Sequence, residues 1–274
     1  MRFRPIIGWA VFFFILAIIA QAVPSMSGCF YFIKGKRLYA KGDYKAAASA
    51  YEHSVASDPK FARGYVELGL SYRELKDYPK AEEAFSKAVT IVDDSCAECG
   101  LGMVYYLQGK HEQAEAALKK AQVLNPTDPC AFNQLGRMYY DLERYPEAVE
   151  TFRKELKLRP TAVSYHFLGN SYGYIDKFEE ARYAYKAALI LDPKYTPLYL
   201  DLGRTCNRLG RHVEAIDAFR KAIKAKPNDS AARFALGMTE LTYGNPKAAL
   251  EQYDFLRNSD PEKAELLKQA FNRR

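Results

Sequence analysis

The 274-residue sequence lacks the features that usually mark linkers or disordered tails. It has no block of like charges, no tract rich in proline, glycine and serine, and only one tryptophan. Hydrophobic residues make up 49% and charged residues 27%, the composition of an ordinary folded protein. The net charge is +7, but the basic residues are scattered among acidic ones. Without an Arg/Lys-rich stripe, no nucleic-acid partner is expected.

The sequence also lacks the motifs of common enzyme classes. Its four histidines form no H-E-x-x-H pair, and no G-x-x-x-x-G-K-[ST] loop or dinucleotide-binding fingerprint occurs. The segment 169–173 matches G-x-S-x-G, but that motif needs a strand before it and here lies within a predicted helix. We therefore expect no enzymatic activity, no cofactor and no metal.

The single long apolar run is residues 6–23, after Arg2 and Arg4. Three interpretations remain open. Residues 1–23 are a cleaved signal peptide with an A-x-A site at 20–22, or an uncleaved transmembrane anchor. Alternatively, residues 26–29 resemble a bacterial lipobox, in which Cys29 is lipidated. Residues 24–27 are then a short linker, and the expected location is membrane-anchored or exported, in the periplasm or another extracytoplasmic space.

The rest of the chain carries a repeat of 33 or 34 residues. Six Leu-Gly pairs and one Lys-Gly pair keep this spacing: Gly35, Gly69, Gly102, Gly136, Gly169, Gly203 and Gly237. Alanine follows each glycine after twelve residues, and an aromatic residue or leucine follows after sixteen. Helical spacing of apolar residues predicts two amphipathic helices in each repeat, whose small residues allow close packing.

This pattern resembles the tetratricopeptide repeat (TPR), and in particular exported or membrane-anchored bacterial TPR proteins. The resemblance implies an all-α, right-handed superhelical solenoid of about seven helix-turn-helix repeats, preceded by an N-terminal hydrophobic helix. The repeats are expected at 28–61, 62–94, 95–128, 129–161, 162–195, 196–229 and 230–263. A helix over 264–274 is expected to cap the last repeat.

The resemblance also implies a groove that binds a protein or peptide ligand. In TPR proteins the first helices of the repeats line this groove, at positions six and three before the glycine and one and four after it. The central groove residues expected here are Asn133, Arg137, Tyr140, His166, Asn170, Arg204 and Asn207. Asparagine can hydrogen-bond a peptide backbone, and arginine can bind a carboxylate with two parallel bonds.

Cysteines occupy similar offsets in the third and fourth repeats. Ser95 and Glu98 match the S-x-x-E capping box, which predicts a helix starting at Ser95. Cys96, in the first turn, is expected to be the most reactive thiol, because a helix N-terminus lowers a thiol pKa. Cys96, Cys99 and Cys130 are predicted to face the groove, as reactive thiols or with a disulfide joining Cys96 to Cys99 or reaching Cys130.

The expected function is a non-catalytic protein–protein interaction scaffold. It would bind a peptide or partner protein in the groove, at an extracytoplasmic membrane face, and assist assembly of a larger complex. Two alternatives stay open: a thiol or redox protein that uses Cys96, Cys99 and Cys130, and a membrane adaptor that faces the cytoplasm.

Overall fold

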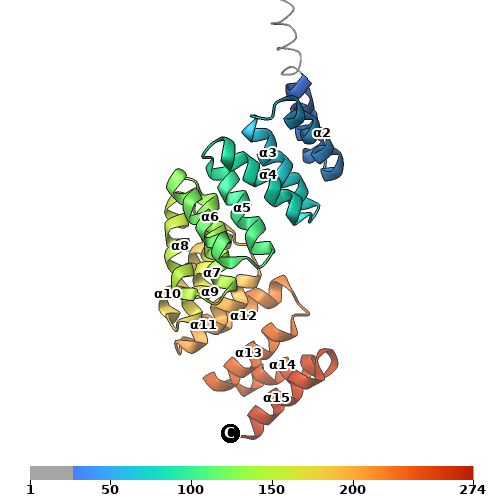
Figure 1. Ribbon diagram of the computed structural model, residues 1–274. Helices are drawn as coiled ribbons and strands as arrows, with labels where there is room; N and C mark the ends of the chain where they lie inside the picture. The colour runs from blue at the N-terminus through green and yellow to red at the C-terminus, as the bar shows by residue number, and fades with distance from the viewer. Residues whose placement is uncertain (1–26, 274) are drawn as a thin grey trace, which may run out of the picture. The chain divides into compact units, whose positions relative to one another are not determined.

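The structure, a computed structural model, describes residues 27–273 (Figure 1). Within these residues the regular secondary structure is α-helical throughout, without a strand. Contacts divide the chain into two compact units, Met1–Gln134 and Leu135–Arg274. The predicted hydrophobic helix over residues 1–23 lies outside the described part. Among the helices that are described, none is long and apolar enough to cross a membrane.

The helices follow each other as pairs joined by short turns. In the first unit, residues 27–40 are helical, followed by α2 (Tyr44–Ser57), α3 (Ala62–Glu74), α4 (Tyr78–Ile91), α5 (Ser95–Leu107), α6 (His111–Leu124) and the start of α7 (Pro129–Asp141). The second unit contains the rest of α7, then α8 (Tyr145–Leu158), α9 (Ala162–Tyr174), α10 (Phe178–Leu191), α11 (Pro197–Arg208), α12 (His212–Ala225), α13 (Ser230–Tyr243), α14 (Pro246–Ser259) and α15 (Pro261–Asn272). Neighbouring helices pack on each other within each unit, which confirms the all-α repeat architecture.

Close packing within each pair depends on the small residues of the repeat. All seven alanines twelve residues after the glycine are 0% exposed: Ala47, Ala81, Ala114, Ala148, Ala181, Ala215 and Ala249. Four residues further along the second helix, Phe85, Phe152 and Phe219 are also 0% exposed. Their rings lie against the repeat glycines; a Cβ atom on Gly203 would come within 2.8 Å of three ring atoms of Phe219.

The turn between the two helices of a pair uses the same backbone conformation in every repeat. Seven residues after each repeat glycine, the residue has positive φ: Gly42, Lys76, Gly109, Glu143, Asp176, Gly210 and Gly244. The left-handed region is unfavourable for residues with a Cβ atom. The repeat architecture therefore imposes the turn even where the sequence offers lysine, glutamate or aspartate.

The last helix covers the end of the second unit. Leu267 of α15 is 0% exposed and packs with Leu256, Ala264 and the partly buried Phe234. It also fills the space at Gly237, where a Cβ atom would lie 2.7 Å from a Leu267 methyl group. The helix begins at Pro261, earlier than the predicted segment 264–274, because Asp260 caps it by accepting from the Lys263 backbone N–H.

Candidate functional site

The predicted groove residues of the second unit surround a hollow of about 380 Å³. Its lining comes from α7, α9, α10, α11 and the turn before α10: Tyr140, Asn170, Gly173, Tyr174, Asp176, Phe178, Tyr185, Asp201, Arg204, Thr205 and Arg208. The structure thus brings Tyr140, Asn170 and Arg204 together.

Four other predicted groove residues do not line this hollow. Arg137 is exposed, and its guanidinium lies 5.5 Å from the centre of the Phe167 ring. His166 and Asn207 are partly buried, on α9 and α11. Asn133 is partly buried on the portion of α7 that belongs to the first unit.

Aromatic side chains form one wall of the hollow. Tyr140 makes edge contacts with Phe167 and Tyr174, and Tyr145 stacks on Tyr174 with ring centres 4.3 Å apart. Burial, together with the neighbouring Tyr174, raises the pKa of Tyr140 to about 12. Its hydroxyl therefore stays protonated at neutral pH and keeps its capacity to donate a hydrogen bond.

Two of the three predicted groove asparagines, Asn170 and Asn207, are engaged by neighbouring side chains. The Tyr185 hydroxyl donates to Asn170 Oδ1 at 2.7 Å, and Asn170 Nδ2 donates to the Tyr140 hydroxyl at 3.5 Å. Asn207 Nδ2 donates to Thr239 Oγ1 of α13 at 2.6 Å. The bonds to Tyr140 and to Thr239 join successive repeats, so the asparagines have a structural use besides the predicted contact with a peptide.

His166 is also tied to the following repeat. Its Nδ1 lies 3.0 Å from the Tyr195 hydroxyl, and its Nε2 lies 3.1 Å from Asp201 Oδ2. The His166 side chain is only 16% exposed. It orients Asp201, whose other oxygen lies 3.9 Å from Arg204 Nη1.

Two exposed arginines on α11 supply the positive charge of the hollow. Arg204 and Arg208 are four residues apart and so lie on the same face of the helix. The Arg204 side chain is 59% exposed, and the Arg208 guanidinium lies 6.0 Å from the Phe178 ring centre. Two like charges at this spacing repel each other, so an anion between them is favoured.

The sequence interpretation missed Tyr174, Phe178, Asp201 and Arg208. Tyr174 and Arg208 each lie five residues after the repeat glycine, in the last turn of the first helix. The groove positions considered in the sequence analysis end at the fourth residue after the glycine, one residue earlier. A pattern search that includes the last helical turn would find both.

The cysteines of the first unit differ from the prediction in two respects. The helix α5 does begin at Ser95, but its cap is Asp94, whose carboxylate accepts from the backbone N–H groups of Cys96 and Ala97 at 2.7 and 2.9 Å. Glu98 does not complete a capping box, because it is buried and pairs with Lys120 at 2.7 Å. The carboxylate one residue before Ser95 takes the capping position.

The pKa of the Cys96 thiol is raised, opposite to the prediction. Partial burial is the main cause, and the negative charge of Asp94 adds to it. Cys96 is exposed, Cys130 is partly buried, and Cys99 is buried at 4% exposure, so the three thiols do not share one open face. Cys29 is exposed, and Cys206 is fully buried within α11. No group of metal-ligating side chains occurs among residues 27–273.

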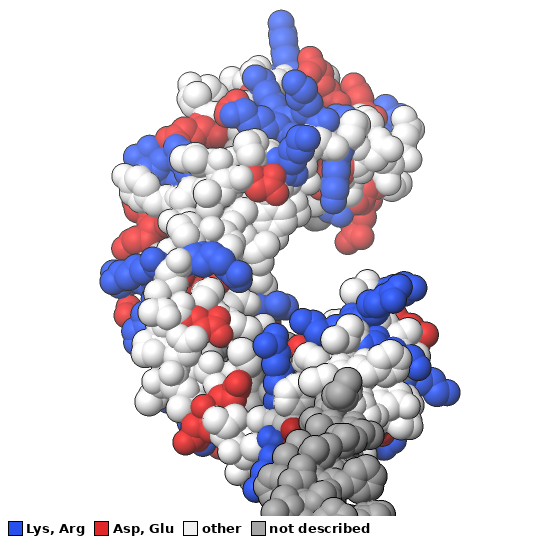
Figure 2. Space-filling model, turned by 90° about the horizontal axis from the view of Figure 1, so that it is seen from above, with Lys and Arg blue, Asp and Glu red and all other residues white. Residues whose placement is uncertain are grey.

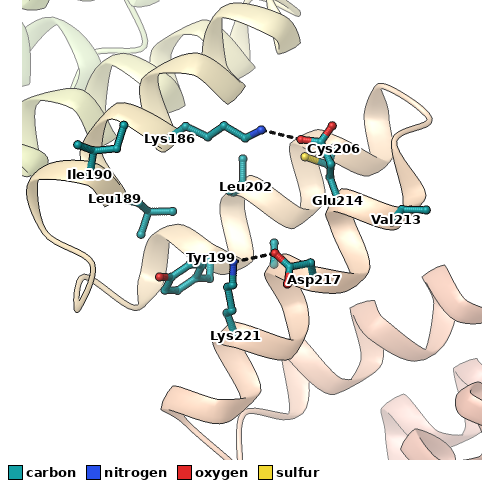
Figure 3. A pocket seen from close by; sticks show the side chains of 11 residues that line it. Lys186, Leu189, Ile190, Tyr199, Leu202, Cys206, Val213, Glu214, Asp217 and Lys221 are labelled. Carbon is teal, nitrogen blue, oxygen red and sulfur yellow. Dashed lines mark hydrogen bonds and ion pairs between the residues drawn. The ribbon is translucent and has the colours of Figure 1, made fainter.

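A second hollow, of about 520 Å³, lies between α10, α11 and α12 (Figure 3). Apolar side chains such as Leu189, Tyr199 and Leu202 line it. At its rim the ion pair between Lys186 and Glu214 is drawn as a dashed line (Figure 3).

An equivalent hollow of about 480 Å³ occurs in the first unit. Most of its lining residues lie 134 positions before those of the second hollow; Tyr65 and Leu68, for example, match Tyr199 and Leu202. Its recurrence at equivalent positions in the two units indicates that this hollow follows from the packing of successive repeats. It does not distinguish a ligand site.

Charged side chains are mixed over the surface. Figure 2 shows basic and acidic side chains interspersed over much of the visible face, with uncharged areas between them. Many pair within one helix, such as Lys87 with Glu83 at 2.7 Å and Lys119 with Glu115 at 2.7 Å. Such pairs are typical of a solvated helix face.

Comparisons with known proteins match several segments of the chain to one type of repeat. Family models described as tetratricopeptide repeat match residues 34–95, 95–128, 131–162 and 168–230. Superkiller protein 3 of Schizosaccharomyces pombe is 26% identical over 206 residues, which are 74% of this chain and 13% of the relative. Anaphase-promoting complex subunit 3 of the same organism is 22% identical over 225 residues, 80% of this chain and 34% of the relative. The chain thus spans about a third or less of the length of these relatives.

Solved structures show the same fold. YrrB, described as a TPR protein with an unusual peptide-binding site, has a TM-score of 0.64 and 23% identity, covering 69% of this chain and 99% of its own. The C-terminal part of a TPR protein from Cytophaga hutchinsonii has a TM-score of 0.72 and 19% identity, covering 86% and 98%.

TPR proteins typically mediate protein–protein interaction and complex assembly, and they are generally non-catalytic scaffolds. Their fold is the helix-pair packing described above for each unit. The seven-fold repeat, the buried alanines and the matching family models lead to one conclusion: this chain belongs to the tetratricopeptide repeat family.

Proposed function

We propose that this protein is a non-catalytic scaffold whose second unit binds an extended acidic peptide segment of a partner protein. The hollow at Arg204 is the binding site. Arg204 and Arg208 bind a carboxylate of the peptide, and Tyr140, Tyr174 and Phe178 contact an apolar or aromatic side chain beside it. The observation that carries the proposal is that two exposed arginines and an aromatic wall line the same hollow.

The polar network below the arginines supports this role. His166 and Asp201 hydrogen-bond each other, and Asp201 lies 3.9 Å from Arg204. At that distance the carboxylate orients the guanidinium without a strong ion pair, and the Arg204 donors remain accessible to a ligand. A carboxylate that accepts two parallel bonds from one arginine gains both affinity and a defined orientation.

The test is a double substitution, Arg204→Ala with Arg208→Ala. Peptides that place an aspartate or glutamate next to an aromatic residue are screened on an array, and the best binder is measured by fluorescence anisotropy. We expect the double variant to lose about 10- to 100-fold in affinity, because hydrogen bonds to charged groups contribute roughly 1.5–3 kcal/mol.

Arg257→Ala is a matched control. Arg257 Nη1 lies 3.9 Å from Asp254 Oδ1, three residues earlier, and the Arg257 side chain is 62% exposed, so Arg257 matches Arg204 in spacing, distance and exposure but lies on α14. This variant should bind the peptide normally. Unchanged binding by the double variant at physiological salt, or an equal loss in the control, would remove the hollow as the recognition site.

We further propose that the scaffold acts at an extracytoplasmic membrane face. The support is the uncharged run 6–23, which follows two arginines. Protease protection in intact cells, with the mass of the mature N-terminus, distinguishes a cleaved, an anchored and a lipidated form. Protection of the repeats on the cytoplasmic side would instead support the cytoplasm-facing adaptor.

A further inference from the structure

Two cysteine side chains from successive repeats are in direct contact. Cys99 lies on α5 and Cys130 is the second residue of α7, and their Sγ atoms are 3.3 Å apart. Both residues belong to the first unit. A disulfide has a sulfur–sulfur distance of about 2.05 Å, so the two atoms need to approach by roughly 1.3 Å.

The helices hold both thiols in place. Cys99 is 4% exposed within the middle of α5. Cys130 lies in the first turn of α7, where its backbone N–H donates to Asp128 Oδ1 at 2.9 Å. The contact therefore results from the stacking of two repeats and does not depend on a flexible loop.

We propose that Cys99 and Cys130 form a reversible disulfide that links α5 to α7, and that Cys96 remains a thiol. Cys96 and Cys99 are three residues apart on one helix, where Cβ atoms are about 5–6 Å apart. A disulfide requires Cβ atoms about 3.5–4.5 Å apart, so a bond between these two residues would distort α5. The geometry thus selects Cys99–Cys130 among the pairings that the sequence left open, because the sulfur atoms of this pair are in direct contact.

The oxidant is a low-molecular-weight disulfide, and the reaction proceeds by thiol–disulfide exchange. The thiolate of Cys130, the more exposed of the two residues, attacks one sulfur of the oxidant and expels the other as a thiolate. Cys99 then loses its proton to solvent and attacks Cys130 Sγ, releasing the second small thiolate. Two protein thiols lose two protons and two electrons, and the small disulfide is reduced to two thiols.

The second step is expected to be the slow one. In the reduced protein the hydrogen bond with Cys130, and then burial, raise the pKa of the Cys99 thiol well above its ordinary value, and burial still acts once Cys130 carries the mixed disulfide. The thiolate is the nucleophile, so closure of the protein disulfide should accelerate as the pH rises. The mixed disulfide on Cys130 should therefore accumulate transiently near neutral pH.

The cross-link should stabilise the first unit. It closes a loop of about 30 residues that contains all of α6. Restricting the unfolded chain by such a loop should raise the thermal midpoint by about 5–10 °C. The bond lies outside the proposed peptide-binding hollow, so this inference does not depend on the proposed function.

The experiment incubates the full chain with oxidised glutathione and maps the products by mass spectrometry without reductant. We expect a cross-linked pair of peptides containing Cys99 and Cys130, with Cys96 alkylated or glutathionylated. The thermal midpoint should rise on oxidation in the native sequence and in Cys96→Ser. The rise should disappear in Cys130→Ser, which replaces the less buried partner and spares the core position.

Two results would overturn the proposal. One is a disulfide that joins Cys96 to Cys99 or to Cys130. The other is glutathione held on Cys130 at pH 9 while Cys99 stays reduced. If Cys130→Ser fails to fold, Cys130→Ala provides the same comparison, because alanine is accommodated in a first helical turn.

Discussion

The packing of the repeat glycine on the aromatic ring leads to a quantitative prediction for Gly203→Ala. Gly203 lies within α11, and a Cβ atom there would have three atoms of the Phe219 ring within 2.8 Å. Phe219 is 0% exposed and packed on all sides, so it cannot move away without displacing neighbours. Over-packing of this kind costs about 1–3 kcal/mol.

The same substitution at Gly173 is the matched control. Gly173 lies in the last turn of α9, where an added Cβ atom would meet nothing within 4 Å and the backbone φ is not positive. Alanine favours the helix over glycine by up to about 1 kcal/mol. Gly173→Ala should therefore be neutral or slightly stabilising. The same preference of alanine for the helix offsets part of the cost of the clash in Gly203→Ala.

The expected difference between the two variants is about 1–3 kcal/mol, with Gly203→Ala the less stable. Chemical denaturation followed by circular dichroism measures it, and a thermal midpoint lower by roughly 3–10 °C should accompany it. Adding Phe219→Ala removes the ring, so the two substitutions together should be less harmful than the sum of their separate effects. Equal stability of Gly203→Ala and Gly173→Ala would refute this account of the repeat core.

Three further predictions use single residues. Glu143→Gly should stabilise the protein by about 0.5–1 kcal/mol, because residue 143 has a φ of 59° that glycine adopts without a steric cost. Urea unfolding measures the change, and a loss of stability would contradict this prediction. Asp94→Asn should keep the α5 cap but lower the pKa of Cys96, because the negative charge of Asp94 contributes to raising that pKa. Iodoacetamide labelling of Cys96 should then accelerate at a lower pH in the variant than in the native sequence. Glu214→Gln should lower stability near pH 7 by up to about 1 kcal/mol after solvent screening, since Lys186 and then Arg211 depress the Glu214 pKa to about 2. Stability from a depressed pKa is present above the ordinary value of 4.5 and lost as the pH falls toward 2, so the difference between native and variant should shrink between pH 5 and pH 2 in urea titrations.

The candidate site shows where sequence offsets are sufficient and where they are not. The offsets group Tyr140, Asn170 and Arg204 on one face, and the three line one hollow, because helical periodicity determines the face on which a residue lies. The offsets do not show that Asn207 is bonded to Thr239, or that His166 is bonded to Asp201. These contacts join residues more than 30 positions apart, and they depend on how one repeat stacks on the next.

The sequence by itself determined the architecture of the repeats. A spacing of 33 or 34 residues, a glycine, an alanine twelve residues later and a bulky residue four residues after that specify two closely packed helices, because only small residues allow the backbones to approach. The positive φ of the turn residue recurs at the same spacing, but the structure was needed to show it at Glu143, where the residue type does not indicate it. Only the tertiary structure decided that Glu98 pairs with Lys120, that Cys99 is buried, and that its sulfur contacts Cys130. Contacts between helices and between repeats depend on distances in space, and the spacing of residues along the sequence does not give these distances.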